Sequence, residues 1–429
     1  MFDTVLVANR GAIATRILRT LRRMDIRSVA VYADCDADSL HVRQADQAFC
    51  LGEGGAAETY LNMERILEVA RESGAQAIHP GYGFLSENAE FVRRCEAAGI
   101  AFIGPTPEQM QAFGLKHRAR DLAEAAGVPL LPGSGLLDTL AAAEAEALRI
   151  GYPVMLKSTA GGGGIGMQLC HDAAELAGAF DSVRRLGANN FADDSVFLEK
   201  FIGRARHIEV QVVGDGQGRA LALGERDCSS QRRNQKVVEE CPAPNLEDAT
   251  RTALHSTAEH LLSSIGYRNA GTVEFIYDAD TAAFYFLEVN TRLQVEHGVT
   301  EEVYGVDLVE WMLRIAAGTA PDLDAERVAL RPRGHAVQVR VYAEDPWLDF
   351  QPCAGLLSHV SFPSGDGVRI DHWIESGVEV PSFFDPMLAK VIVHAADRSA
   401  ALQKLQRTLD EIELYGSETN LGYLRALSR

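Results

Sequence analysis

The first hundred residues alternate short apolar stretches with longer amphipathic ones. Residues 4–9 (TVLVAN) are followed by 11–24 (GAIATRILRTLRRM) and 28–33 (SVAVYA), and the pattern continues through YLNMERILEVARESG, AQAIHP, FVRRCEAAG and IAFIGP. Strands joined by helices in this way form a parallel sheet that helices cover. Residues 1–114 are therefore predicted to form a Rossmann-like βαβ domain, which ends near the turn-rich block GPTPEQM.

A second domain is predicted for residues 115–329, with a smaller unit inserted at about 130–202. These inserted residues, here called the lid unit, read as helix, strand, glycine run, strand, helix and strand, in the order AAAEAEALRIG, YPVMLKST, GGGGIG, MQLC, DAAELAGAFDSVRRLG and SVFLEKFI. A compact unit between larger domains could move over a site as a lid. Beyond residue 203 the chain is rich in strands, and 207–225 is predicted to be a hairpin that turns at Asp215 and Gly216.

Residues 330–429 are predicted to form a third domain of short strands, closed by the amphipathic helix SAALQKLQRTLDEIELYG (399–416). The fold class is therefore α/β, with α+β character in this C-terminal part. The chain length fits about three domains, each large enough for its own core.

The composition limits the partners and the compartment. A formal net charge of −19 argues against a protein that binds nucleic acid or membrane surfaces. The start MFDTVLVANRG has no long apolar region, and no later run approaches the ~18 apolar residues of a membrane helix, so a cytoplasmic location is predicted. The seven cysteines include no CxxC pair, which indicates a reducing compartment and neither a disulfide framework nor a zinc site.

The stretch KSTAGGGGIGM (157–167) sets one lysine before a run of glycines. Gly161, Gly163 and Gly166 have the GxGxxG spacing of a dinucleotide site, but the strand-like MQLC follows where that site needs a helix. A P-loop is excluded because its lysine follows the glycines, whereas Lys157 precedes them. A glycine flap between two strands remains, with backbone N–H groups free to cover phosphates. A flexible surface hairpin is the alternative.

Polar side chains alternate along residues 284–296 (FYFLEVNTRLQVE). In a regular strand one side would present Phe284, Phe286, Glu288, Asn290, Arg292, Gln294 and Glu296. The preceding strand GTVEFIY brings Glu274 beside them, and two facing carboxylates would raise one pKa unless a cation lies between them. The hard oxygen donors of Glu274, Glu288 and Asn290 suit a magnesium ion that holds nucleotide phosphates. A cross-strand surface pair is the alternative.

Positive groups lie in two other segments of this acidic chain. The loop GERDCSSQRRNQK (224–236) contains Arg232, Arg233 and Lys236, which reverse the local charge. The strand GHAVQVRVYAED puts its valines on one face and its polar residues on the other, so Arg340 is predicted to have a functional place. His207 begins a strand and is ambiguous, because a lone strand histidine is more often structural.

Together these segments resemble the biotin carboxylase component of biotin-dependent carboxylases, an ATP-grasp enzyme. The resemblance covers nearly the whole chain and is carried, in order, by VANRGAIATRI, HPGYGFLSEN, FIGP, the glycine flap, HIEVQV, ERDCSSQRRNQKVVEE, GTVEFI, FLEVNTRLQVEH, GHAVQVRVYAEDP and FDPMLAK. Several long motifs in the right order make this resemblance far more specific than the glycine run alone.

The resemblance implies a set of site residues. Glu274, Glu288 and Asn290 match ligands of magnesium or manganese, and Glu296 matches the base that deprotonates bicarbonate. Arg340 matches the residue that stabilises the enolate-like oxygen of biotin. Bicarbonate itself is held by the matches Lys236, Arg292, Gln294 and the Val295 backbone. The matches for cofactor binding, ATP above all, are Tyr82, Lys116, Lys157, Gly162, Gly163, Gly164, Met167, Glu199, Lys200, Ile202, His207, Gln231, Asn234 and Ile276.

The reaction implied by the resemblance begins when bicarbonate attacks the γ-phosphate of ATP and gives carboxyphosphate. This breaks down to carbon dioxide and phosphate, and the phosphate deprotonates the biotin ureido nitrogen, which is then carboxylated. The planar fork of Arg292 suits a carboxylate-shaped anion. Closing the glycine flap would exclude the water that otherwise hydrolyses carboxyphosphate.

Three departures from the common pattern point to one branch of the family. Acyl-CoA and pyruvate carboxylases usually have a basic residue at Ile165, histidine at Asn234 and proline at Gly298. The variants present here resemble urea carboxylase, which occurs within urea amidolyase, or the similar guanidine carboxylase. This assignment depends on resemblance alone, because nothing in the site selects urea. The alternatives are the biotin carboxylase subunit of an acyl-CoA carboxylase and another ATP-grasp ligase that does not use biotin.

The chain contains no Met-Lys-Met biotin attachment motif. The resemblance therefore implies that biotin arrives on a separate carrier domain or subunit and that a carboxyltransferase domain completes the reaction. Members of the family also often form homodimers. A non-catalytic scaffold of the same fold is a further alternative, but all the matched acids and cations are present.

Overall fold

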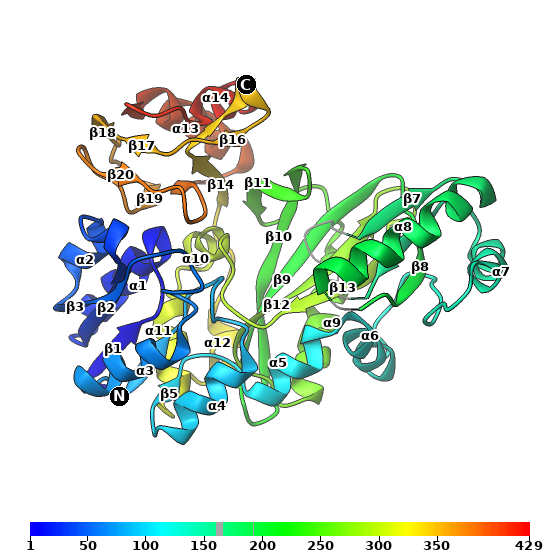
Figure 1. The fold of residues 1–429 in the computed structure, drawn as a ribbon, viewed down its shortest axis with the longest axis horizontal. Helices are drawn as coiled ribbons and strands as arrows, with labels where there is room; N and C mark the ends of the chain where they lie inside the picture. Colours follow the sequence, from blue (N-terminus) through cyan, green and yellow to red (C-terminus); the bar gives the residue numbers. More distant parts are fainter. Residues whose placement is uncertain (160–165, 192) are drawn as a thin grey trace.

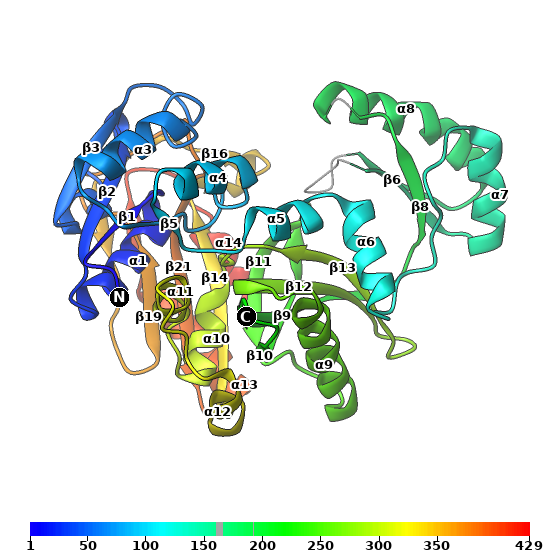
Figure 2. The ribbon, with the colours of Figure 1, turned by 90° about the horizontal axis from the view of Figure 1, so that it is seen from below.

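The structure is a computed structural model that describes residues 1–159, 166–191 and 193–429. Figure 1 shows the N-terminal sheet and its helices at the left, the C-terminal region above them, and long strands running from the centre to the right. The lid unit projects at the far right, and Figure 2 shows it on the opposite side of the molecule from the N-terminal sheet. Among the residues described, no helix is long and apolar enough to cross a membrane.

The N-terminal region forms the predicted parallel sheet. Its elements are β1 (Thr4–Val7), α1 (Gly11–Arg23), β2 (Arg27–Ala33), η1 (Asp34–Asp36), α2 (Leu40–Gln44), β3 (Gln47–Gly52), α3 (Met63–Glu72), β4 (Ala77–His79), α4 (Ala89–Ala97), β5 (Ala101–Phe102) and α5 (Pro107–Gly114). The strand order is β3-β2-β1-β4-β5. Strand β1 is buried along its whole length, and Ile13, Ile17 and Leu21 recur at each turn of α1 in the core beside it.

The lid unit has a small core of its own. Strand β6 (Val154–Ser158) lies between β7 (Met167–Cys170) and β8 (Val196–Lys200), and α7 (Leu140–Ile150) and α8 (Ala173–Phe191) pack on this antiparallel sheet. The predicted order of helix, strand, strand, helix and strand is confirmed. The glycines at 161–164 and Ile165 lie outside the described residues.

One antiparallel sheet of eight strands joins the second and third predicted domains. In spatial order its strands are β13 (Phe284–Asn290), β12 (Arg268–Asp278), β9 (Ala205–Asp215), β10 (Ala220–Arg232), β11 (Gln235–Cys241), β14 (His335–Tyr342), β21 (Met387–Ala395) and β19 (Val368–His372). Strands β9 and β10 form the hairpin predicted at 207–225. Strand β11 pairs with β14 across the boundary predicted at residue 330, so the two regions share backbone hydrogen bonds.

Helices cover this eight-stranded sheet. Helix α9 (Asp248–Ser264) packs on β9 and β10, and α13 (Arg398–Glu411) packs on β14 and β21. The remaining elements are α6 (Lys116–Ala125), α10 (His297–Tyr304), α11 (Leu308–Ala316), α12 (Leu323–Ala329), β15 (Glu344–Asp345), η2 (Pro346–Leu348), β16 (Gln351–Pro352), β17 (Gly355–Leu356), β18 (His359–Ser361), β20 (Glu379–Val380), β22 (Glu413–Tyr415) and α14 (Leu421–Leu427).

The closing helix is shorter than predicted. Helix α13 ends at Glu411, and Ile412 adopts an extended backbone that leads into β22, the partner of β18. Leu414 is buried between two exposed neighbours in β22. The last apolar residues of the predicted helix therefore alternate as a strand does.

A β-bulge interrupts the strand predicted at 284–296. Glu274 faces Glu288 and Phe275 faces Phe286 across β12 and β13, which leaves Leu287 as an extra residue. Phe286 joins the core whereas Glu288 points to the cavity described below, although a regular strand would put both on one side. The strand ends at residue 290, so the predicted alternation is wrong beyond that point.

Candidate active site

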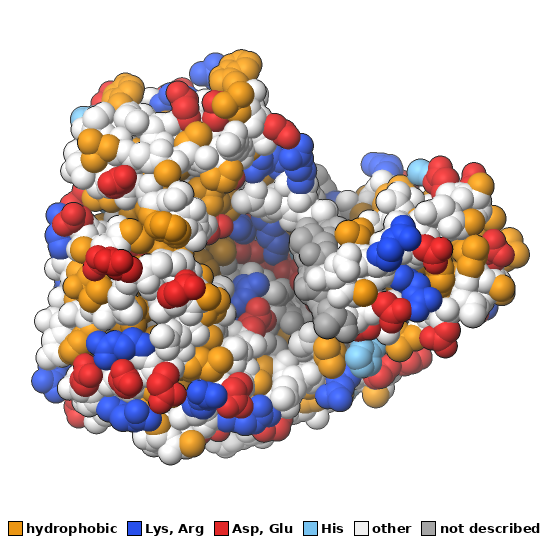
Figure 3. Space-filling view, viewed as in Figure 1, with side chains coloured by type: hydrophobic (Ala, Val, Ile, Leu, Met, Phe, Trp, Pro, Cys, Tyr) orange, Lys and Arg blue, Asp and Glu red, His pale blue; other side chains and the backbone are white. Residues whose placement is uncertain are grey.

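A cavity of about 960 Å³ lies where the N-terminal region, the lid unit and the eight-stranded sheet meet. Figure 3 shows the hollow between the main body and the lid unit, with cationic and acidic side chains in its depth. Every predicted site residue within the described part of the chain lines this cavity, and Gly162, Gly163 and Gly164 lie outside that part. The fold thus brings together motifs that are far apart in the sequence.

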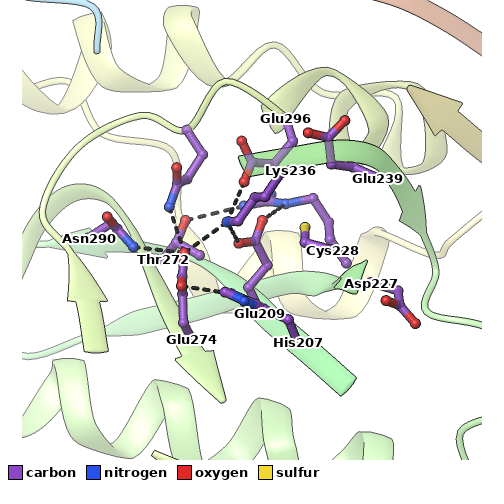
Figure 4. A network of polar contacts seen from close by, with 12 residues as sticks. His207, Glu209, Asp227, Cys228, Lys236, Glu239, Thr272, Glu274, Asn290 and Glu296 are labelled. Carbon is purple, nitrogen blue, oxygen red and sulfur yellow. Dashed lines mark hydrogen bonds and ion pairs between the residues drawn. The ribbon is translucent and has the colours of Figure 1, made fainter. Parts of the chain in front are cut away.

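Lys236 stands in the middle of a carboxylate cluster on the cavity wall (Figure 4). Its Nζ lies 2.6 Å from Glu209, 2.9 Å from Glu274 and 2.7 Å from Glu296. Burial alone would lower the pKa of Lys236, but the three carboxylates raise it well above its usual value. The ammonium group therefore stays charged and is shared by acids from three segments.

Glu209 belongs to this cluster but was not predicted from the sequence. Its fully buried carboxylate binds Arg226 Nε at 2.5 Å as well as Lys236. Burial would raise the pKa of Glu209, but Lys236 and Arg226 bring it to about 2. Donor atoms of His207, Glu209 and Glu274 lie within 4.8 Å of one another, but the lysine already neutralises both acids. The alternation in HIEVQV is a signal that could have found Glu209.

Glu274 and Glu288 face each other across β12 and β13. Burial and the charge of Glu274 raise the pKa of Glu288. Burial also acts to raise the pKa of Glu274, but Lys236 and His207 lower it. His207 Nε2 lies 2.7 Å from Glu274, and Asn290 Nδ2 donates to Glu274 at 2.9 Å. A bound cation would relieve the repulsion that raises the pKa of Glu288.

Glu296 lies between two cations. Lys236 contacts one carboxylate oxygen at 2.7 Å, and Arg340 Nη2 lies 3.1 Å from the other. Burial and Glu209 act to raise the pKa of Glu296, but Lys236, Arg340 and Arg226 lower it below its ordinary value. A buried carboxylate that remains ionised can accept a proton from a bound acid.

Arg340 also binds Glu239, a second glutamate that was not predicted from the sequence. Glu239 accepts hydrogen bonds from Arg340 Nε at 2.6 Å and from Gln338 Nε2 at 3.0 Å. Burial acts to lower the pKa of Arg340, but the charges of Glu239 and Glu296 raise it well above its usual value. The polar face predicted for this strand is confirmed, because Gln338 and Arg340 bind the same carboxylate.

The turn after β13 holds the residues predicted for bicarbonate. Arg292 donates to Gln294 Oε1 at 2.8 Å and to Asn290 Oδ1 at 2.9 Å. Its Nε donates to Glu87 at 2.8 Å. Glu87 lies in the HPGYGFLSEN motif but receives no role in the sequence analysis, because nothing in that loop indicates which residue it faces.

Lys390 supports this turn from the C-terminal region. Its fully buried Nζ donates to the Val295 carbonyl at 3.0 Å and lies 3.5 Å from Asp371. Burial lowers the pKa of Lys390 to about 8, against the opposing charge of Asp371. Lys390 was not predicted as a site residue, although a lysine among the apolar residues of MLAKVIVHA is a signal of a buried role.

The lid unit brings its own charges to the cavity. Lys157 of the lid unit and Arg120 of α6 both form ion pairs with Glu199 of the lid unit. Lys200 Nζ donates to the carbonyls of residues 151 and 152, so its ammonium group binds the backbone of the lid unit. Lys116 reaches the same cavity, and burial lowers its pKa.

Arg232 and Arg233 do not line the cavity. Arg232 binds Glu344 at 2.9 Å, and Arg233 binds Asp349 at 2.7 Å. The local excess of positive charge predicted from sequence is therefore already paired, and only Lys236 of the three cations faces the site.

A lid unit on three short strands, set against an antiparallel sheet with facing acids and lysines, is the arrangement of an ATP-grasp ligase. Three family models match successive parts of the chain. The biotin carboxylase N-terminal domain matches residues 1–110, and the ATP binding domain of the carbamoyl-phosphate synthase L chain matches 116–323. The biotin carboxylase C-terminal domain matches 338–429.

Individual proteins agree with these models. The urea amidolyase of Saccharomyces cerevisiae is 53% identical over all of this chain, which spans only 23% of that protein. The biotin carboxylase of Halalkalibacterium halodurans is 49% identical over 99% of this chain and 93% of its own length. A solved structure is the biotin carboxylase domain dimer of the Hydrogenobacter thermophilus 2-oxoglutarate carboxylase, in complex with MgADP, ADP and bicarbonate. It has a TM-score of 0.93 at 42% identity, over 100% of this chain and 94% of that one.

The chain therefore belongs to the biotin carboxylase family. It is an ATP-grasp ligase that carboxylates biotin in an ATP-dependent reaction.

Proposed function

We propose that the chain carries out the first half-reaction of a urea or guanidine carboxylase, in which carboxyphosphate forms from ATP and bicarbonate and supplies the carboxyl group of biotin. The observation that supports this most is the state of Glu296, which is buried, lies between Lys236 and Arg340, and has a lowered pKa. An ionised base beside two cations suits an anionic acid such as bicarbonate.

We assign the metal and the nucleotide to one side of the cavity. The oxygens of Glu274, Glu288 and Asn290 fit magnesium, because the facing carboxylates need a positive charge between them. When bound, magnesium would neutralise phosphate charge. Lys116, Lys157 and His207 would hold the phosphates, and the MgADP complex of the Hydrogenobacter thermophilus relative supports this assignment.

We assign bicarbonate and biotin to the other side. Arg292, Gln294 and the Val295 backbone would hold bicarbonate while Glu296 takes its proton. The bicarbonate oxygen then bonds to the γ-phosphorus, and the bond to ADP breaks. Carboxyphosphate splits into carbon dioxide and phosphate, the phosphate accepts the ureido proton, and the ureido nitrogen bonds to carbon dioxide. Arg340 would stabilise the negative biotin oxygen.

Two substitutions test these roles by ATP cleavage with bicarbonate, with and without free biotin. We expect Glu296→Gln to lower biotin carboxylation by roughly 100- to 10,000-fold with nearly unchanged ATP affinity, because a positioned base is lost. Arg340→Ala should keep the slow bicarbonate-dependent cleavage and lose its stimulation by biotin. Arg233→Ala, whose side chain lies outside the cavity, is the matched control.

The base assignment is wrong if Glu296→Gln retains more than about a tenth of the wild-type rate. Loss of the biotin-independent cleavage in Arg340→Ala would move Arg340 to the nucleotide site.

The urea or guanidine branch is the finer part of the proposal. Of its three marker residues, Asn234 lines the cavity, while Ile165 lies outside the described residues. A Cβ on Gly298 would come within 2.5 Å of Ile392 Cδ1, so a proline there would require Ile392 to move.

The branch is tested with this chain alone and with the chain joined to carrier and carboxyltransferase domains. We expect the isolated chain to ignore urea, because none of the residues assigned above forms a urea pocket. The joined enzyme should carboxylate urea or guanidine and not acyl-CoAs. Urea-dependent ATP cleavage by the chain alone would contradict this division, and carboxylation of acetyl-CoA by the joined enzyme would exclude the branch.

We further propose that biotin reaches Arg340 on a carrier domain and that a carboxyltransferase domain consumes carboxybiotin. The small share of the urea amidolyase that this chain spans leaves room for both. The domain limits 1–114, 115–329 and 330–429, and a homodimer like that of the Hydrogenobacter thermophilus relative, remain part of this proposal.

A further inference from the structure

We propose that the carrier domain docks on an apolar surface at the mouth of the cavity, formed by Trp347, Leu348 and Phe383 and here named the rim surface. This inference rests on the proposed function and adds where the carrier binds. The three side chains are 92%, 62% and 59% exposed. Large apolar side chains that remain this exposed on segments leading from a cavity indicate a binding surface.

The rim surface lies at one end of the β14–β21 pair. Tyr342 and Met387 are opposite each other at that end, and both line the cavity. The chain after Tyr342 and the chain before Met387 therefore leave the sheet side by side, and Ala343 N donates to the Pro386 carbonyl at 2.9 Å.

These two segments carry all three rim residues. Trp347 and Leu348 form η2 in the first segment, and Phe383 lies in the second, next to the cavity-lining Phe384. The tip of the β10–β11 hairpin lies at the same end of the sheet, because Arg232 binds Glu344.

Contacts with the β10–β11 hairpin and within the segment itself hold the segment that carries Trp347. The Arg232 guanidinium lies 3.8 Å from the centre of the Phe350 ring, and Arg233 binds Asp349 with two hydrogen bonds. Asp345 accepts a hydrogen bond from the Trp347 backbone at 2.8 Å. The tryptophan is therefore exposed on an ordered support, which reduces the entropy lost when a partner binds.

The chemistry of the site selects the carrier domain as occupant. Biotin on a carrier is a tethered group, and Arg340, which it must reach, is nine-tenths buried in the cavity wall. A folded carrier cannot enter a cavity of about 960 Å³, so its body must rest at the mouth while the tether extends inward. A small apolar contact also suits a partner that must leave after each turnover.

The test compares two forms of the same substrate. The double variant Trp347→Ser/Leu348→Ser and the single variant Phe383→Ser are assayed with free biotin and with a purified, biotinylated carrier domain of a urea carboxylase. We expect kcat/KM for the carrier to fall roughly tenfold, chiefly through KM, because aromatic anchors dominate small interfaces. The value for free biotin should stay within about twofold of wild type, as for ordinary surface substitutions.

Val328→Ser is the matched control, because Val328 is 72% exposed on α12 and does not line the cavity. It should change neither value. Unchanged carrier kinetics in the rim variants, or an equal loss with free biotin, would overturn the docking assignment. A shift from dimer to monomer in sedimentation without a carrier effect would make the rim surface an interface between two copies instead. Failure of the proposed function is distinguishable, because free biotin would then not stimulate ATP cleavage in the unchanged chain.

Discussion

Two of the cations that face the cavity, Lys236 and Arg340, are each also held by an acid that does not line it. Glu209 holds Lys236 and Glu239 holds Arg340, and both glutamates are fully buried behind the cavity wall. Removing either acid would leave a buried cation with one partner fewer. The protein's own acids therefore fix both cations, and fixed charges are the ones that stabilise a transition state most.

Lys390 gives a pH dependence at this scale. Its pKa in the folded chain is about 8, whereas an unfolded lysine titrates near 10.5. Between these pH values the unfolded chain holds more protons, so the free energy of unfolding should rise with pH, by at most about 1.4 kcal/mol per pH unit. Urea unfolding at pH 7.5, 8.5 and 9.5 measures this, with Lys390→Met as the reference that lacks the group.

The groups that face Lys390 are Asp371, Arg369, Glu301, Arg16 and His297. All are present in both proteins, so the difference between wild type and Lys390→Met isolates the lysine. Parallel stability curves over this pH range would show that Lys390 keeps an ordinary pKa.

At the scale of elements, the hydrophobic periodicity and the turn residues of a segment predict its local secondary structure. The parallel N-terminal sheet, the lid unit and the 207–225 hairpin follow from alternation, from helix-length apolar faces and from an Asp-Gly turn. The bulge at Leu287 does not, because an extra residue is defined only by its partner strand. For the same reason the residues of β22 were predicted to be helical, because only their pairing with β18 makes them a strand.

In the candidate site too, local features are predicted from the sequence, whereas contacts between distant residues are not. The polar faces around Glu288 and Arg340 are visible in the sequence as alternation, and the family resemblance supplies the rest of the predicted residues. Glu87 and Glu239 were not predicted because each binds an arginine that lies 205 or 101 positions away, and Lys390 was not predicted because it binds a backbone carbonyl. Spacing along the chain carries no information on such contacts.

At the scale of the molecule, one buried ionic network joins three regions. Arg16 of α1 binds Glu301 at 2.7 Å and Asp307 at 2.9 Å. Arg369 of β19 binds Glu301 at 2.8 Å and Asp371 at 2.8 Å. Helix α1, helix α10 and the edge strand β19 of the large sheet are therefore connected by shared carboxylates.

Arg16 and Arg23 form a matched pair for measuring this tie, because both lie on α1 and both bind Asp307. Arg16 is buried, whereas Arg23 is 56% exposed. We expect Arg16→Met to lower the free energy of unfolding by about 3–5 kcal/mol, because two buried acids lose a partner. Arg23→Met should cost less than about 1 kcal/mol. If urea unfolding gave equal losses of free energy for the two variants, burial of the network would add nothing to stability.

The eight-stranded sheet also limits where recombination can divide the sequence of this chain. A break between β11 and β14 would leave two unpaired strand edges, each with free N–H and C=O groups that promote aggregation. Recombination at that point would therefore yield two fragments that neither fold nor stay soluble on their own. Gene fusions that move this activity between larger enzymes should transfer the segment from β9 to β21 as one uninterrupted block, with new domains attached outside it.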